Sequence, residues 1–149
     1  MIAGGVATGI VPGLRVLAPH YDALTLDLWG VLHDGVRPYP WVIPCLGRLR
    51  DAGKKLCVLS NAPRRVSRIA AHMAGMGLSP ELVDAIYSSG EATYETLNGT
   101  TGRHPAGRSF GQRCLHIGAA DDAQLVSATD VRLVADPVEA DFVLCTGVD

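Results

Sequence analysis

This chain of 149 residues has few aromatic residues and no large excess of one charge. Phe, Trp and Tyr make up 5% of it, too few for the stacking platforms that bind single-stranded nucleic acid. The formal net charge is −2, and no run of Lys and Arg is longer than two residues. Proteins that bind nucleic acid carry a basic patch for the phosphates. We therefore expect no nucleic-acid partner.

Metal-binding and disulfide cysteine patterns are absent as well. The four cysteines, Cys45, Cys57, Cys114 and Cys145, include no Cys-x-x-Cys pair. Three of them lie in apolar, strand-like segments, so we interpret them as buried thiols rather than zinc ligands or a disulfide framework. Reduced thiols are typical of the cytoplasm, and a cytoplasmic location is the prediction.

The sequence also has no long hydrophobic run near its start. The early apolar stretch, residues 9–17, is interrupted by Pro12 and Gly13, and no positive segment precedes it. A secretory signal begins with such a positive segment, and a membrane helix needs about 20 apolar residues. We expect residues 1–20 to be a lead-in to the first strand, without membrane attachment.

Short apolar runs alternate with segments of helical periodicity through the rest of the chain. Hydrophobic residues make up 48% and charged residues 19%, a composition typical of globular α/β proteins. The alternation predicts βαβ units and a mostly parallel sheet. The predicted strands are 23–28, 55–59, 85–87, 114–117, 131–134 and 141–146, and the predicted helices are 41–52, 64–74, 91–97 and 123–128.

A polar, glycine-rich stretch at 99–112 interrupts this alternation and is predicted to be a linker. It separates a first module, residues 21–98, from a second, residues 113–149. At the end of the first module we expect Ser89 to cap the helix at 91–97. Glu91 is interpreted as a surface group that complements the dipole of that helix.

Two predicted strands end on residues suited to phosphoryl chemistry. Asp27 follows the first strand within Leu-Asp-Leu-Trp-Gly-Val-Leu-His, residues 26–33, and Ser60 and Asn61 follow the second. Open α/β sheets place their sites at the carboxyl ends of the strands, so we expect these residues to lie together. A carboxylate nucleophile beside a hydroxyl and exposed N–H groups indicates a site that handles phosphoryl groups.

These two segments resemble motifs I and II of the haloacid dehalogenase (HAD) superfamily. The similarity is greatest to its class IIA branch, which is NagD-like and nitrophenylphosphatase-like, and it covers residues 21–149. It implies an α/β fold, with an incomplete Rossmann-like parallel-sheet HAD core followed by the beginning of an α/β cap. The lysine motif and the acidic metal-binding motif that follow the cap in that branch have no counterpart in the sequence.

The resemblance also implies roles for individual residues. Asp27 would attack phosphorus and form an aspartyl-phosphate, while Ser60 and Asn61 would hold the phosphoryl oxygens. Mg²⁺ would be bound by the Asp27 carboxylate and the backbone carbonyl of Trp29, with the ligand set incomplete in this chain. The substrate would be a small phosphorylated metabolite, whose identity the sequence does not reveal, and a homodimer is left open.

Trp29 departs from the family pattern, because related phosphatases carry an acid/base aspartate at that place. Three alternatives follow: a weak phosphatase, a protein that binds phosphorylated ligands without turnover, and a different nucleophilic displacement. His33 and Asp34 are interpreted as a surface histidine beside an Asp-Gly turn, with a relocated acid/base pair as the alternative.

Arg64 and Arg65 are interpreted as a solvated first helical turn, or alternatively as an aid in attracting phosphate. Residues 118–122 lack the Gly-x-Gly-x-x-Gly pattern of a nucleotide site, and His116 is interpreted as a core histidine. Because the family motifs are incomplete, we expect a fragment of a longer hydrolase or an inactive gene remnant. We expect these 149 residues alone to be close to inactive and poorly soluble.

Overall fold

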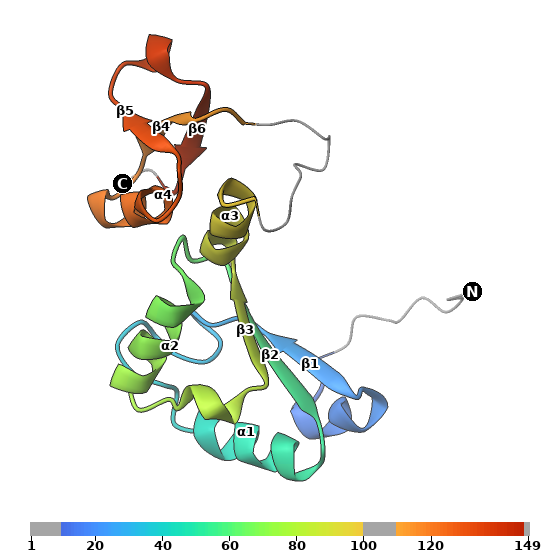
Figure 1. Ribbon diagram of the computed structural model, residues 1–149. Helices are drawn as coiled ribbons and strands as arrows, with labels where there is room; N and C mark the ends of the chain where they lie inside the picture. The colour runs from blue at the N-terminus through green and yellow to red at the C-terminus, as the bar shows by residue number, and fades with distance from the viewer. Residues whose placement is uncertain (1–9, 100–109, 148–149) are drawn as a thin grey trace, which may run out of the picture.

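The computed structural model describes residues 10–99 and 110–147, which form two α/β modules (Figure 1). The first module contains a parallel sheet in the order β1-β2-β3, with β2 in the middle. Its elements are β1 (Ala23–Leu26), α1 (Val42–Asp51), β2 (Lys55–Ser60), α2 (Val66–Gly75), β3 (Ala85–Ser88) and α3 (Ser89–Leu97).

The second module holds another parallel sheet, in the order β5-β4-β6. Its elements are β4 (Arg113–Ile117), the 3-10 helix η4 (Ala120–Ala123), α4 (Gln124–Ser127), β5 (Arg132–Val134), η5 (Pro137–Glu139) and β6 (Phe142–Cys145). Figure 1 shows this module beyond the end of the first sheet, beside α3. The remaining 3-10 helices are η1 (Leu14–Val16), η2 (Ala18–His20) and η3 (Pro80–Leu82).

The observed elements confirm the predicted α/β class with parallel strands. Boundaries differ from the prediction by one or two residues, as at β1, which ends at Leu26. The predicted cap of α3 is wrong, because the Ser88 hydroxyl, not that of Ser89, accepts the N–H of Glu91 at 3.0 Å. The strand therefore passes directly into the helix, and Ser89 is already helical. Residues 100–109 of the predicted linker lie outside the described residues.

The core of the first module fixes the direction of side chains at the end of β2. Successive strand residues point to opposite faces, so Leu56, Val58 and Ser60 share the buried face of this strand. Leu56 and Val58 are almost fully buried in a core cluster that includes residues of α1 and α2, each contributing about 1.5–3 kcal/mol by burial. Ser60 is thus carried into the protein, while Leu59 is half exposed.

Strand β1 lies at the edge of its sheet, and within the described residues it pairs with β2 alone. An edge strand presents N–H and C=O groups that can pair with another strand. Among the described residues, no helix is long and apolar enough to cross a bilayer.

Candidate functional site

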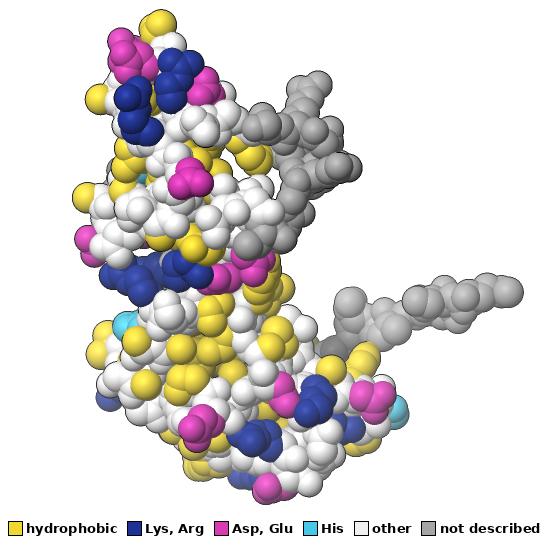
Figure 2. Space-filling view, viewed as in Figure 1, with side chains coloured by type: hydrophobic (Ala, Val, Ile, Leu, Met, Phe, Trp, Pro, Cys, Tyr) yellow, Lys and Arg dark blue, Asp and Glu magenta, His cyan; other side chains and the backbone are white. Residues whose placement is uncertain are grey.

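A cleft of about 760 Å³ lies between the two modules. Figure 2 shows basic and acidic side chains side by side at the level where the modules meet. The second module lines the cleft with residues 119–122. The first module contributes Leu28, Trp29, His33, Gly35, Ser60, Ala62, Pro63, Arg64, Arg68, Ile69 and His72.

Asp27 and Ser60 lie at the same edge of the sheet. Leu26 is in register with Val58, so β1 and β2 end within two residues of each other. Asp27 is exposed, and its Oδ1 accepts the N–H of Leu28 at 2.7 Å. Buried Ser60 accepts the N–H of Ala62 at 3.2 Å through its Oγ. This bond uses the Ser60 oxygen as an acceptor and leaves its O–H to donate elsewhere.

The cleft does not gather every predicted site residue. Ser60, Trp29 and His33 line it, whereas Asp27, Asn61 and Asp34 are not among its lining residues. Asn61 is exposed and contributes its backbone carbonyl, which accepts the hydroxyl of Ser89 at 2.9 Å.

The segment after Asp27 folds back as a short flap. The Leu28 carbonyl accepts both Leu32 N–H and His33 N–H, and Gly30 N–H donates to the His33 carbonyl at 2.8 Å. Trp29 is 72% exposed at this turn. Its Nε1 lies 3.2 Å from the point that a Cβ on Gly35 would occupy. A side chain at Gly35 would therefore crowd the indole in the cleft.

The prediction of His33 as a surface residue is wrong, because the flap buries it to 4% exposure. Its Nδ1 accepts the N–H of Gly35 at 2.8 Å, which places the proton of the neutral ring on Nε2. That Nε2 is buried and has no hydrogen-bond partner among the described residues. Burial and nearby His72 lower the pKa of His33 despite Asp34 and Asp27. A neutral ring tied to the flap supports a structural role.

Asp34 forms the turn that the sequence indicated. Its Oδ1 accepts the N–H groups of Val36 and Arg37, each at 2.9 Å, and these bonds lower the pKa of the carboxyl. The Arg37 guanidinium lies 3.7 Å from Oδ2 in an exposed ion pair. Its carboxylate is thus occupied in holding the loop.

The loop that follows β2, residues 61–65, is fastened to the start of α3. The Ser88 hydroxyl donates to the Arg64 carbonyl at 2.6 Å, and Ser89 donates to the carbonyls of Asn61 and Ala62. At Gly90 the two segments touch: an added Cβ would lie 2.3 Å from the Arg64 nitrogen. Only glycine permits this approach.

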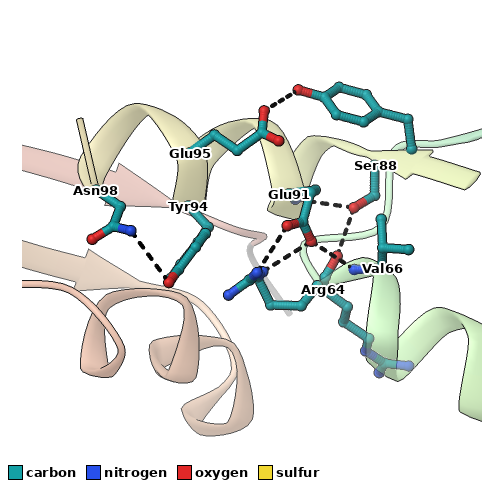
Figure 3. A network of polar contacts seen from close by, with 9 residues as sticks. Arg64, Val66, Ser88, Glu91, Tyr94, Glu95 and Asn98 are labelled. Carbon is teal, nitrogen blue, oxygen red and sulfur yellow. Dashed lines mark hydrogen bonds and ion pairs between the residues drawn. The ribbon is translucent and has the colours of Figure 1, made fainter. Parts of the chain in front are cut away.

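Glu91 completes this attachment and is not the surface group that was predicted. Its carboxylate accepts Arg65 Nε and Nη2, both at 2.9 Å, and the N–H of Val66 at 2.8 Å. Figure 3 shows Glu91 turned toward Val66 at the start of α2. The Arg65 guanidinium also lies 3.3 Å from the centre of the Tyr94 ring.

Hydrogen bonds between Arg65 and Glu91 shift the pKa values of both side chains. Arg65 lowers the pKa of Glu91 and Glu91 raises that of Arg65. The interpretation of Arg65 as a solvated residue is therefore wrong. A Ser-Ser-Gly-Glu run directly after a strand indicated a helix start, but nothing in its spacing identified Arg65 as the partner.

Two further contacts involve the second module. Arg68 of α2 donates to the side chain of Gln124 at 2.8 Å, and its Nη2 lies 3.9 Å from Asp121. Arg68 thus joins the two sides of the cleft. Half-buried His116 lies 2.9 Å from the hydroxyl of Thr146, as expected for a satisfied core histidine.

The described residues do not by themselves fit a complete magnesium site. Among them, no group of three or more His, Cys, Asp and Glu side chains could hold a metal ion. Asp27 and the carbonyl of Trp29 offer two oxygens, whereas Mg²⁺ takes six ligands in an octahedron.

Comparison with known proteins places this arrangement in a family. The family model of haloacid dehalogenase-like hydrolases matches residues 24–132. A HAD-like hydrolase from Brucella suis 1330 has 30% identity and a TM-score of 0.76, over 93% of this chain and 49% of that one. No curated protein matches the chain in sequence.

Two more distant structures share the fold. The 4-nitrophenylphosphatase of Thermotoga maritima is 21% identical with a TM-score of 0.61, over 87% of this chain and 46% of that one. NagD from E. coli K-12 is 23% identical with a TM-score of 0.57, over 83% and 45%. The chain spans about half the length of these relatives, as the resemblance implied. It belongs to the haloacid dehalogenase-like hydrolase family, the superfamily that its two strand-end motifs indicated.

Proposed function

We propose that this chain carries the nucleophile of a phosphatase that acts on a small phosphorylated metabolite. The observation that supports the proposal is the placement of Asp27 and Ser60 at the ends of adjacent parallel strands beside the cleft. This is the edge at which open α/β sheets bind ligands. The Ser60 hydroxyl can donate to a phosphoryl oxygen because its own oxygen accepts Ala62 N–H.

The proposed reaction has two displacements at phosphorus. A carboxylate oxygen of Asp27 attacks phosphorus while the bond to the ester oxygen breaks, giving an aspartyl-phosphate and an alcohol that takes its proton from water. Water then attacks the same phosphorus, releasing inorganic phosphate and restoring Asp27. Trp29 has no carboxylate to supply or accept these protons, so we expect slow turnover.

Magnesium is part of this proposal. The glycerol phosphate phosphatase of Mycobacterium tuberculosis, 20% identical, was solved in complex with magnesium. In this chain the Asp27 carboxylate and the Trp29 carbonyl would hold the ion, with water or groups outside the described residues as further ligands. A bound cation would offset the repulsion between Asp27 and the phosphate.

Hydrolysis of a panel of phosphate esters with Mg²⁺ tests the proposal, in this chain and in a full-length relative. Asp27→Asn should abolish turnover. Asp34→Asn is the matched control, since asparagine can keep the turn and turnover should persist. Loss of turnover in Asp34→Asn but not in Asp27→Asn would contradict the assignment of the nucleophile.

The exposed indole of Trp29 favours a second candidate, a protein that binds phosphorylated ligands without turnover. Such a protein would bind inorganic phosphate or a phosphate ester and release the ester intact. Measured binding without hydrolysis in the full-length relative as well would favour this candidate over the phosphatase.

A further inference from the structure

Two adjacent arginines at the start of α2 have different surroundings. Arg65 is half-buried and fully engaged by Glu91 and Tyr94. Arg64 is exposed and lines the cleft together with Ser60 and Trp29. Figure 3 shows its side chain pointing away from Glu91. Among the described residues, its guanidinium has no acceptor.

The backbone of Arg64 is nevertheless fixed. Its carbonyl accepts the Ser88 hydroxyl at 2.6 Å, and Gly90 packs against its peptide group so closely that no Cβ would fit. Arg65, the next residue, is held by Glu91. The Arg64 side chain therefore projects from a rigid point, which reduces the ordering cost of binding a ligand.

The surrounding fold does little to stabilise the positive charge of Arg64 in this position. The N-terminus of a helix carries partial positive charge, which disfavours a cation there and favours an anion. The other guanidinium lining the cleft, that of Arg68, already contacts Gln124 and Asp121. Within the described residues, Arg64 is thus the cleft guanidinium that lacks a counter-ion.

We propose that Arg64 binds the phosphoryl group of the ligand, beside the hydroxyl of Ser60. A guanidinium presents planar N–H donors that can bind two phosphate oxygens at once. In this assignment Ser88, Gly90 and Glu91 are positioning residues, because they hold the loop from which Arg64 projects. The proposal rests on the proposed function only in requiring a phosphorylated ligand, which both candidate functions share.

Binding of inorganic phosphate to the chain, followed by NMR shifts of the Ser60 and Asn61 amides, tests this assignment without turnover. Arg64→Gln should weaken phosphate binding by about 10- to 100-fold, the range for a charge-assisted hydrogen bond. Arg48→Gln is the matched control, since it removes one exposed positive charge from α1, away from the cleft. It should leave the phosphate affinity unchanged.

Three results would overturn the assignment: no phosphate binding by the chain, equal affinity in Arg64→Gln, or an equal loss in Arg48→Gln. Phosphate binding that depends on Arg64, without ester hydrolysis in a full-length relative, would contradict the phosphatase and support this site. Hydrolysis by that relative, with an unchanged KM when its residue matching Arg64 is replaced by Gln, would support the phosphatase and contradict the Arg64 site.

Discussion

The guanidinium of Arg65 and the carboxylate of Glu91 join two segments that are 26 residues apart, through two hydrogen bonds of 2.9 Å each. The pair holds the start of α2 against the start of α3, and the loop between β2 and α2 is fixed by this contact. Its side chains are 32% and 14% exposed, so it is better shielded from solvent than the other ion pairs of the described residues.

Glu91→Gln should lower the free energy of unfolding by about 2 kcal/mol, because Arg65 keeps its charge and loses its counter-ion. Urea unfolding measures the change. Arg37→Gln is the control: its ion pair with Asp34 is exposed, and its loss should have little effect. Equal stability of Glu91→Gln and the wild-type chain would show that the pair contributes nothing.

The contribution of Glu91 should depend on pH. Arg65 holds the pKa of the folded carboxyl below its ordinary value of 4.5. The stabilisation is therefore fully present above that value and is lost as the pH falls through the lowered, folded pKa. Urea unfolding at several pH values should show the gap in stability between the wild-type chain and Glu91→Gln closing as the pH falls below 4.5 and through the lowered pKa. A constant gap would contradict the ion pair as its origin.

Gly90→Ala should destabilise the first module by about 1–3 kcal/mol, because the new methyl group would overlap the backbone of Arg64. Gly47→Ala is the control. It lies within α1 with open space around its Cβ, and should instead stabilise the helix by about 0.5–1 kcal/mol. Thermal unfolding of both variants gives the comparison, and similar midpoints would refute the close contact.

Trp29→Asp should raise ester turnover in this chain, or in a full-length relative that carries tryptophan at the matching position, by up to about 10²–10⁴-fold, since it supplies a carboxylate at the acid/base position. The side chain is 72% exposed, so the replacement should cost little stability. The gain should be larger for an alkyl phosphate, whose leaving oxygen needs a proton, than for nitrophenyl phosphate. An equal gain for both esters would argue against proton transfer by this residue.

The free edge of β1 should make the isolated chain self-associate. Thr25→Lys places a charge on an exposed position of this strand and should reduce association, as seen by sedimentation or light scattering. Ala71→Lys adds the same charge on the surface of α2 and serves as the control. If both variants behave alike, the edge is not the contact.

The local pattern of the sequence was sufficient to predict the helices and strands and the family to which the chain belongs. Periodicity depends on neighbouring residues, so β2 and α2 lie within two residues of their predicted bounds. Asp27 and Ser60 could be placed at one edge because parallel strands of a βαβ unit end together. The turn at Asp34 follows from its own side chain and two nearby N–H groups.

Contacts between distant segments were decided by the tertiary structure. The partnership of Arg65 with Glu91, the burial of His33 and the entry of residues 119–122 into the cleft all depend on how helices and loops pack. Sequence spacing does not determine such packing. Arg64 and Arg65 are adjacent and have nearly the same neighbours along the chain, so the local pattern could not show which of them would be paired. Only the approach of α3, permitted by Gly90, engaged Arg65 with a carboxylate and left Arg64 facing the cleft.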